Sequence, residues 1–220
     1  MCVNYVTVSR QLAFDFFRTS MEEIDDWRDE LYQDYVGPII VQDEAGNRKG
    51  LTGTYGVIPK RHMPPDQRLT TMNARAETVG QLRTYKSAWA KSQFCLVLMV
   101  RFFEPNWEQP THVRWSIGMA NGEPFAVAGL YREWVEEDEK RTFSFTQLTI
   151  NADDHPFMNR FHRPGEEKRS LVIVPISEYD EWLGCKDPER ARTYLQPYPA
   201  DLMCGEPAPK IPSGKQHELF

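Results

Sequence analysis

Cys95-Leu-Val-Leu-Met-Val100 is the first of four runs that decide the fold of this chain of 220 residues. The second run is His112-Val-Arg-Trp-Ser-Ile117, the third is Pro124-Phe-Ala-Val-Ala-Gly-Leu130, and the fourth is Thr142-Phe-Ser-Phe-Thr-Gln-Leu-Thr-Ile150. Runs of this length that are rich in β-branched, aromatic and other apolar residues, separated by turn signals such as Asn121-Gly122, are typical of strands. The four runs together predict a mainly antiparallel sheet.

Further strands and several helices are expected around this sheet. Residues 38–41 and 53–58 resemble strands on either side of a polar turn at residues 43–50, and residues 171–174 resemble one more. Apolar residues at three- and four-residue spacing predict one or two amphipathic helices between about Arg10 and Tyr35. Other helical patterns cover residues 76–91, 153–161, 179–183 and 188–194.

No repeat or linker divides the chain. The sequence therefore predicts an α+β fold, a single domain over residues 1–220 with a β-rich core flanked by helices. The tail from Pro207 to Phe220 contains Pro, Lys and Gly and is expected to be flexible.

The composition excludes several classes of protein. With 40% hydrophobic and 12% aromatic residues the chain is globular and not disordered. No apolar run approaches the roughly 20 residues of a membrane helix, and the start of the chain lacks a secretory signal, so a cytoplasmic location is expected. The four cysteines lie far apart without a C-x-x-C pair, which predicts neither a disulfide framework nor a metal site.

The net charge of −6 argues against a general coat for nucleic acids, because such binding depends on many Lys and Arg side chains. The charge is uneven along the chain. Residues 51–103 carry eight basic and two acidic side chains, a net charge of +6, between two acidic flanks. This central segment is either a solvated face or an anion-binding surface.

Cys2 directly follows the initiator Met, which is typically removed when the next side chain is small. Removal would leave an α-amine and a thiol on neighbouring carbons. The ordinary pKa of the amine, roughly 7.7 to 8.0, makes much of it nucleophilic near neutral pH, so it can form an imine with an aldehyde. The thiol can then close a five-membered thiazolidine. The alternative is an incidental early cysteine.

The stretch Met72-Asn-Ala-Arg-Ala-Glu-Thr78 stands between a loop and the helix expected over residues 76–91. In one interpretation Asn73 caps that helix and Glu77 is an acid in its first turn. In the other, Asn73 is an orienting hydrogen-bond group and Arg75 contacts a phosphate, because the guanidinium fork matches phosphate oxygens.

Two further side chains are candidates for proton transfer. Glu104 follows the first apolar run in Phe102-Phe-Glu-Pro-Asn-Trp107. Desolvation among these aromatics would raise the pKa of Glu104 and suit it to general acid or base catalysis near neutral pH. The alternative is an exposed acid in a turn. His162 titrates near working pH, but a lone His is also common at surfaces and caps.

The order of these features resembles that of the SRAP family, the SOS response-associated peptidase-like proteins that protect abasic sites in single-stranded DNA. The shared order is Met-Cys at the start, N-A-R-x-E, aromatic-aromatic-Glu after a Cys-led apolar strand, and H-x(6)-R. The resemblance covers most of the chain. Supporting matches are Tyr55-Gly-Val-Ile-Pro59, Ser87-Ala-Trp89 with Cys95, and residues 124–130.

The resemblance implies a function in DNA repair and a set of roles. After autoproteolytic loss of Met1, Cys2 would form a thiazolidine crosslink with the sugar aldehyde of an abasic site, through Schiff-base chemistry of the lyase type. Asn73 would position Cys2 and the sugar, Glu104 would assist proton transfer, and His162 would act in ring opening and crosslink reversal. The implied partner is single-stranded DNA, bound by a monomer without metal or cofactor, at the nucleoid. The phosphate contacts would be Arg75 and Arg169.

The sequence also departs from the family pattern. Val3 and Asn4 replace the usual Gly and phosphate-contacting Arg, and Pro105 stands where Trp is common. The spacing after His162 leaves open whether Arg163 or Arg169 meets the phosphate.

Two other functions remain open at this point. One is a peptidase or amide hydrolase that uses Cys2 without DNA, which leaves the +6 segment unexplained. The other is a non-catalytic module for single-stranded DNA or another anion, in which Trp89 or Trp107 stacks on bases. These tryptophans are equally compatible with a place in the core.

Overall fold

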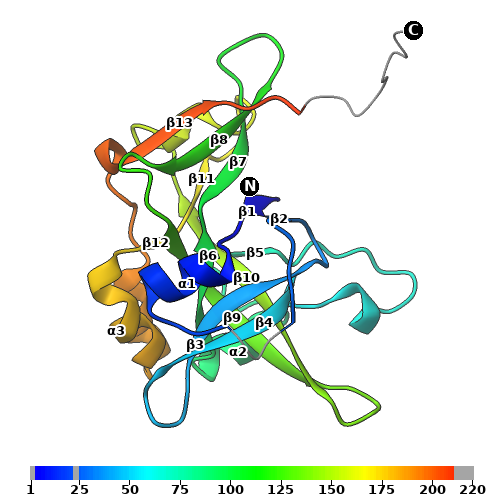
Figure 1. The fold of residues 1–220 in the computed structure, drawn as a ribbon. Helices are drawn as coiled ribbons and strands as arrows, with labels where there is room; N and C mark the ends of the chain where they lie inside the picture. Colours follow the sequence, from blue (N-terminus) through cyan, green and yellow to red (C-terminus); the bar gives the residue numbers. More distant parts are fainter. Residues whose placement is uncertain (1–2, 22–24, 211–220) are drawn as a thin grey trace, which may run out of the picture.

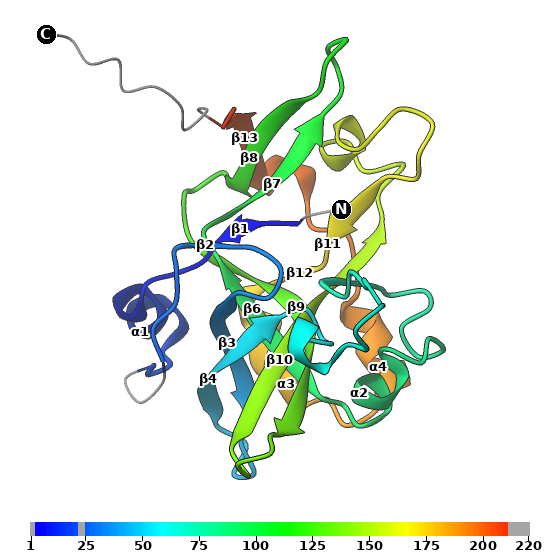
Figure 2. The same ribbon diagram turned by 90° about the vertical axis from the view of Figure 1, so that its right-hand side faces the viewer.

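The computed structural model describes residues 3–21 and 25–210, whose strands form two sheets (Figure 1). Most of the larger sheet lies in the lower half of Figure 1 and the smaller sheet rises above it, and in the turned view of Figure 2 β1 lies on the side of the smaller sheet that faces the larger one. The larger sheet contains β3 (Val36–Gln42), β4 (Arg48–Tyr55), β5 (Asn73–Arg75), β6 (Phe94–Met99), β9 (Phe125–Val135), β10 (Arg141–Asn151), β11 (Arg169–Leu171) and β12 (Ile173–Val174). The smaller sheet contains β1 (Tyr5–Val6), β2 (Glu30–Leu31), β7 (Arg101–Asn106), β8 (Val113–Met119) and β13 (Met203–Pro207).

The larger sheet closes on itself like a barrel. Its order is β11-β10-β4-β3-β6-β9-β12, and β10 also pairs with β9, so that β10, β4, β3, β6 and β9 form a ring. Closure leaves no ring strand with an unpaired edge. The ring pairings are antiparallel except that of β10 with β4, and β5 also joins β10 in parallel. The expected mainly antiparallel, β-rich core is confirmed.

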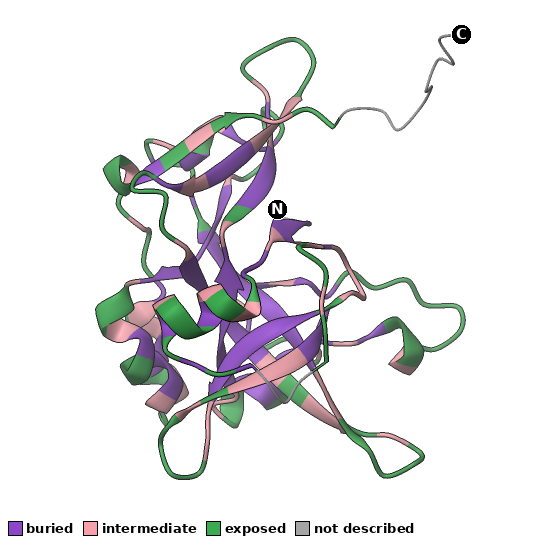
Figure 3. Cartoon of the chain, viewed as in Figure 1, coloured by how far each residue is buried: buried purple, intermediate pink, exposed green. Residues whose placement is uncertain are grey.

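Buried side chains form two clusters on opposite faces of the ring. Figure 3 shows buried residues in purple along the ring strands. Leu96 and Leu98 of β6 belong to the first cluster, while Val97 and Met99 belong to the second. Burial on both faces explains why this strand is apolar at every position. All five ring strands contribute to the second cluster, which fills the ring and continues to Phe102 of the smaller sheet.

Short helices cover the outside of the ring. They are α1 (Arg10–Phe17), α2 (Lys86–Ala90), α3 (Tyr179–Gly184) and α4 (Pro188–Ala191). Trp182 of α3 is fully buried in the first cluster, and its indole N–H donates to the carbonyl of Cys95 at 2.9 Å. The helices expected over residues 179–183 and 188–194 are therefore confirmed.

The helix expected over residues 76–91 is largely wrong. Residues 73–75 form a strand, residues 76–85 form turns, and only α2 is helical. Tertiary bonds override the helical pattern because the backbone N–H of Ala76 donates to Thr149 of β10 at 2.9 Å and its carbonyl accepts from Arg192 at 2.8 Å. Asn73 is consequently a strand residue and does not cap a helix.

Two other helical expectations hold only in part. Between Arg10 and Tyr35 the chain forms α1 and then the strand β2. Helix α1 ends at Arg18, whose φ of 56° is left-handed and stops the helix. Within residues 153–161 the structure has a single 3₁₀ turn, Met158–Arg160, held by the ring of His155, whose Nδ1 accepts the backbone N–H of Met158.

The smaller sheet was mostly missed, apart from the strand at residues 112–117. Glu104 lies inside β7, opposite Trp115 of β8, and not in a turn after the apolar strand. β13 pairs with β8 as far as Pro207 opposite Trp115, and the N–H of Ala208 donates to Arg114 at 2.8 Å. The first two residues of the expected tail are thus held by the sheet, and residues 211–220 lie outside the described chain.

Candidate functional site

The expected site residues come from separate parts of the fold. Asn73 and Arg75 lie in β5, Glu104 lies in β7, and His162 lies in the loop between residues 161 and 168 that leads to β11. Cys2 lies outside the described residues.

The beginning of the described chain is bound to β7. Tyr5 of β1 pairs with Phe102 in antiparallel register, and the carbonyl of Asn4 accepts the N–H of Phe103 at 3.3 Å. Since successive residues of antiparallel strands run past each other, Val3 lies level with Glu104. The structure thereby brings the first described residues to the candidate acid or base.

Glu104 and His162 meet between the smaller sheet and the loop before β11. Nε2 of His162 lies 3.4 Å from Oε2 of Glu104, and the two side chains are only 8% and 3% exposed. The N–H of His162 donates to the carbonyl of Pro105 at 3.1 Å, which fixes the loop to β7. His162 has a φ of 67°, a left-handed conformation that is strained for a residue with a side chain and that tends to occur at functional sites.

Burial shifts the pKa values of this pair in opposite directions. Desolvation raises the pKa of Glu104 to about 7. Desolvation lowers the pKa of His162 to about 4, and the charges of Lys168 and Arg169 contribute to this. Both shifts favour the neutral forms, so the pair near neutral pH is a carboxyl group close to its titration point beside an uncharged imidazole. This arrangement suits the transfer of a proton.

Asn73 has a neighbour that the sequence did not suggest. Gln147 of β10 lies directly opposite Asn73 of β5, and paired residues of adjacent strands point to the same face of a sheet. Gln147 is fully buried, and neither atom of its carboxamide has a hydrogen-bond partner in the described part of the chain. Asn73 is half-buried, and its backbone carbonyl accepts a hydrogen bond from the hydroxyl of Tyr85 at 3.0 Å.

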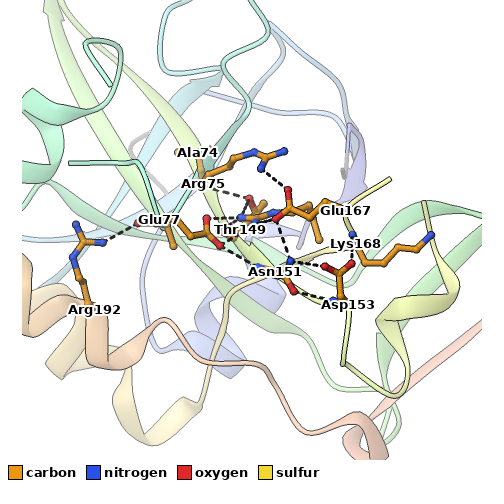
Figure 4. A network of polar contacts seen from close by, with 11 residues as sticks. Ala74, Arg75, Glu77, Thr149, Asn151, Asp153, Glu167, Lys168 and Arg192 are labelled. Atoms are coloured by element: carbon orange, nitrogen blue, oxygen red, sulfur yellow. Dashed lines mark hydrogen bonds and ion pairs between the residues drawn. The ribbon is translucent and has the colours of Figure 1, made fainter. Parts of the chain in front are cut away.

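Arg75 and Arg169 join one polar network, of which Figure 4 labels Arg75, Glu77 and Glu167. Nη1 of Arg75 lies 2.5 Å from one oxygen of Glu167, and Nη1 of Arg169 lies 2.7 Å from the other. Arg169 also binds both oxygens of Glu77 at 2.9 Å and the carbonyl of Thr149 at 2.7 Å. Partial burial raises the pKa of Glu77, but the hydrogen bonds from Arg169 outweigh it and lower the pKa overall.

The exposure of the two arginines differs sharply. The side chain of Arg169 is 2% exposed and that of Arg75 is 48% exposed. The guanidinium of Arg169 therefore faces two carboxylates and a carbonyl, whereas that of Arg75 is open to solvent on one side. Arg163, the other candidate for a phosphate contact, is exposed, with its guanidinium carbon 6.0 Å from the centre of the Trp107 ring.

Asn4, which replaces the family Arg, is also engaged. It is buried, and its amide donates to Glu30. Glu30 pairs in turn with Arg114 at 2.6 Å, and the guanidinium of Arg114 lies over the ring of Phe103. A cation from β8 thus lies beside the first described residues.

Neither a membrane helix nor a metal centre is seen among the described residues. In that part of the chain no helix has the length and apolar character needed to cross a bilayer, and no group of three or more His, Cys, Asp or Glu residues is arranged to hold a metal ion. Cys95 and Cys185 are buried free thiols, and Cys204 is an exposed one.

The fold thus combines two sheets and a barrel-like core with a buried Glu104–His162 pair on the strand that binds the first described residues. The model of the SOS response associated peptidase (SRAP) family matches residues 1–210, and the chain belongs to this family. The resemblance drawn from the motif order is confirmed.

Individual relatives agree with this. The chain is 29% identical over 167 residues to the abasic site processing protein YoqW of Bacillus subtilis, which is 74% of this chain and 70% of that protein. A crystal structure of a protein from Bordetella bronchiseptica is similar at 31% identity with a TM-score of 0.83, covering 96% of this chain and all of the other. A protein from Bacteroides thetaiotaomicron shares the fold at 17% identity and a TM-score of 0.73, over 93% and 90% of the two chains.

Proposed function

We propose that this protein captures abasic sites in single-stranded DNA covalently through Cys2. The observation that carries the proposal is the buried pair Glu104 and His162, 3.4 Å apart, beside the strand that binds the start of the chain. Membership of the SRAP family and the name of the Bacillus subtilis relative support an abasic site as the substrate.

The chemistry begins with the loss of Met1. Autoproteolytic hydrolysis of the first peptide bond consumes one water and frees the α-amine of Cys2, which is the peptidase activity of the proposal. The amine attacks the C1′ aldehyde of the ring-opened sugar, and loss of water gives an imine. The thiol then adds its sulfur to the imine carbon while the nitrogen takes up a proton, which closes the thiazolidine.

Glu104 is the proposed proton carrier. It lies on β7, the strand that pairs with β1 and binds Asn4 near the beginning of the described chain. With a pKa of about 7, Glu104 exists in both forms near neutral pH. It can accept a proton from the attacking amine and return it to the departing hydroxyl. His162, kept neutral by burial, assists opening of the sugar ring and reversal of the crosslink, and Asn73 orients Cys2 and the sugar.

Arg75 is the proposed phosphate contact. Its half-exposed guanidinium can meet a phosphate without leaving the sheet. Arg169, which the sequence also suggested for this role, is 2% exposed and held by carboxylates, so we assign it the positioning of the loop beside Arg75. The protein would work in the cytoplasm, at the nucleoid, as a monomer and without a metal or cofactor.

One experiment separates this function from its alternatives. The mature protein is incubated with single-stranded DNA that carries an abasic site, and denaturing gels are searched for an adduct, with Cys2→Ala as the control. An adduct from the wild type alone is expected. A wild type without an adduct would exclude crosslinking and leave an amide hydrolase or a non-catalytic DNA-binding module. An adduct that survives Cys2→Ala would exclude Cys2 as the nucleophile.

The same assay tests the proton-transfer roles. Glu104→Gln and His162→Ala should each slow formation or reversal of the adduct about tenfold or more while leaving the affinity for undamaged single-stranded DNA within about twofold, because general acid–base catalysis contributes at least that much. An equal loss of affinity would contradict the assigned roles. N-terminal mass spectrometry of each variant shows whether Met1 has been removed.

A further inference from the structure

One carboxylate links the exposed arginine of the site to the buried one. Oε2 of Glu167 binds Arg75 at 2.5 Å, Oε1 binds Arg169 at 2.7 Å, and the side chain of Asn151 donates to Oε1 at 3.2 Å (Figure 4). The hydrogen bond from Arg169 lowers the pKa of Glu167, and the bonds from Asn151 and Arg75 lower it further. The carboxylate therefore stays charged at neutral pH.

The two arginines depend on this carboxylate to different degrees. Arg169 retains both oxygens of Glu77 and the carbonyl of Thr149 when Glu167 turns away. For Arg75 the contact with Glu167 is the one hydrogen bond that its side chain makes in the described part of the chain. Displacement of Glu167 would thus uncover Arg75 and leave Arg169 in place.

The backbone around Glu167 is fixed, while its hydrogen-bonded carboxylate lies at the surface. Lys168 holds the loop at both ends, since its ammonium donates to the carbonyls of His162 and Arg163 at 2.9 and 3.0 Å and its N–H donates to Asp153 at 2.8 Å. The side chain of Glu167 is 35% exposed, so its carboxylate has room to swing toward solvent. A rotamer change is sufficient to open the guanidinium.

We propose that Glu167 is a built-in counter-anion that occupies the phosphate position at Arg75 and must be displaced when DNA binds. A carboxylate and a phosphate present similar acceptor oxygens to a guanidinium, so they compete for the same donors. Glu167 thereby weakens the binding of undamaged single strands. Discrimination between abasic and undamaged DNA then depends on the covalent step at the abasic site. This inference rests on the proposed function, because it takes Arg75 as a DNA contact.

Glu166 offers a matched control for the test. It precedes Glu167 and is exposed, and no contact between its side chain and Arg75 or Arg169 is present. Glu166→Gln and Glu167→Gln change the net charge equally. A difference between these variants therefore reports the contact and not the overall charge.

The experiment measures the affinity for an oligothymidylate without lesions over a series of salt concentrations. Glu167→Gln should bind about three- to fivefold more tightly than Glu166→Gln, the range expected for loss of one exposed ion pair. Its dependence of log K on log salt should stay close to that of Glu166→Gln, because Arg75 meets a phosphate in both complexes once Glu167 has been displaced. On an Arg75→Ala background the advantage of Glu167→Gln should vanish.

Other outcomes contradict the inference. Equal affinities of the two Gln variants, or undetectable binding by both, would mean that Glu167 does not compete with DNA. Weaker binding by Glu167→Gln would make the carboxylate a support that aligns Arg75. Thermal melting verifies that both variants are folded. Adduct formation with abasic DNA is measured separately. A result against covalent crosslinking can therefore be distinguished from a result against competition between Glu167 and phosphate.

Discussion

At the scale of residues, burial shifts the pKa values of Glu104 and His162 by amounts that their sequence neighbours do not predict. The strands around Glu104 leave 3% of its side chain exposed and the loop around His162 leaves 8%. Removing a carboxyl or an imidazole from water penalises the charged form, so the acid becomes weaker and the base becomes weaker too. The sequence indicated the aromatic surroundings of Glu104 but not its partner.

These pKa shifts predict opposing effects of pH on stability. The pKa of Glu104 in the folded protein, about 7, lies above its unfolded value. Its stabilising contribution to the free energy of unfolding is therefore fully present below about pH 4.5 and is lost as the pH rises through 7. The folded pKa of His162, about 4, lies below its unfolded value, so its contribution is present above about 6.5 and is lost as the pH falls through 4. In Glu104→Gln the free energy of unfolding should therefore rise between pH 4 and 6.5, by about 2 kcal/mol.

The His162→Asn variant provides the reverse measurement. Relative to the wild type, its free energy of unfolding should fall by about 2 kcal/mol between pH 4.5 and 7, because of the two opposed shifts only that of Glu104 remains. Denaturant titrations at a series of pH values measure both slopes against the wild type. Parallel slopes in the two variants would contradict the opposed shifts.

At the scale of elements, most strands of the ring were predictable and those of the smaller sheet were largely not. In the ring, β4 begins at Arg48, inside the turn expected over residues 43–50, and ends at Tyr55, before the expected end at residue 58. Ring strand β6 is an apolar run because both of its faces are covered. β7 contains a Glu, a Pro and an Asn, and it becomes a strand only because β1 and β8 pair with it on either side. The turns over residues 76–85 likewise depend on bonds to β10 and to Arg192.

Close packing inside the ring predicts a large cost for one small substitution. A Cβ at Gly129 of β9 would lie 2.7 Å from the carbonyl oxygen of Thr146, 2.8 Å from Sγ of Cys95 and 2.9 Å from Val97. Gly129→Ala should lower the free energy of unfolding by about 2 kcal/mol, since overpacking of a ring strand strains its neighbours. Denaturant titration measures the loss.

The same position provides its own control. Cys95→Ala removes one of the three obstructing atoms, so Gly129→Ala should cost less on that background than in the wild type. Identical costs on both backgrounds would show that Cys95 is not the obstruction. The contact with Thr146 is backbone and would remain in either case.

At the scale of the whole molecule, the +6 segment does not form one basic surface. Its Arg61 pairs with Glu136 at 3.1 Å beside the hairpin of β9 and β10, while Arg75 pairs with Glu167 near His162. Lys86 lies in α2, on the outer side of the ring. The net charge of −6 therefore remains a fair description of the surface as a whole, and the phosphate contact is expected to be local.

The two buried clusters share the ring strands, which predicts cooperative unfolding. Val97 and Leu98 are neighbours in β6 but belong to different clusters. Val97→Ala and Leu98→Ala should each lower the free energy of unfolding, by about 1 to 4 kcal/mol, and each should leave a single transition. Far-ultraviolet and near-ultraviolet circular dichroism should give coincident curves. Separate transitions in either variant would mean that the two faces unfold independently.

The sequence by itself determined the ring strands and the chemical groups of the site. These follow from apolar runs and from residue types in a family order, both of which are written locally along the chain. The tertiary structure alone decided that Glu104 meets His162 and that Glu167 covers Arg75, a contact between residues 92 positions apart. Such contacts depend on strand register and on the path of loops between sheets. These are set by packing that no local segment contains.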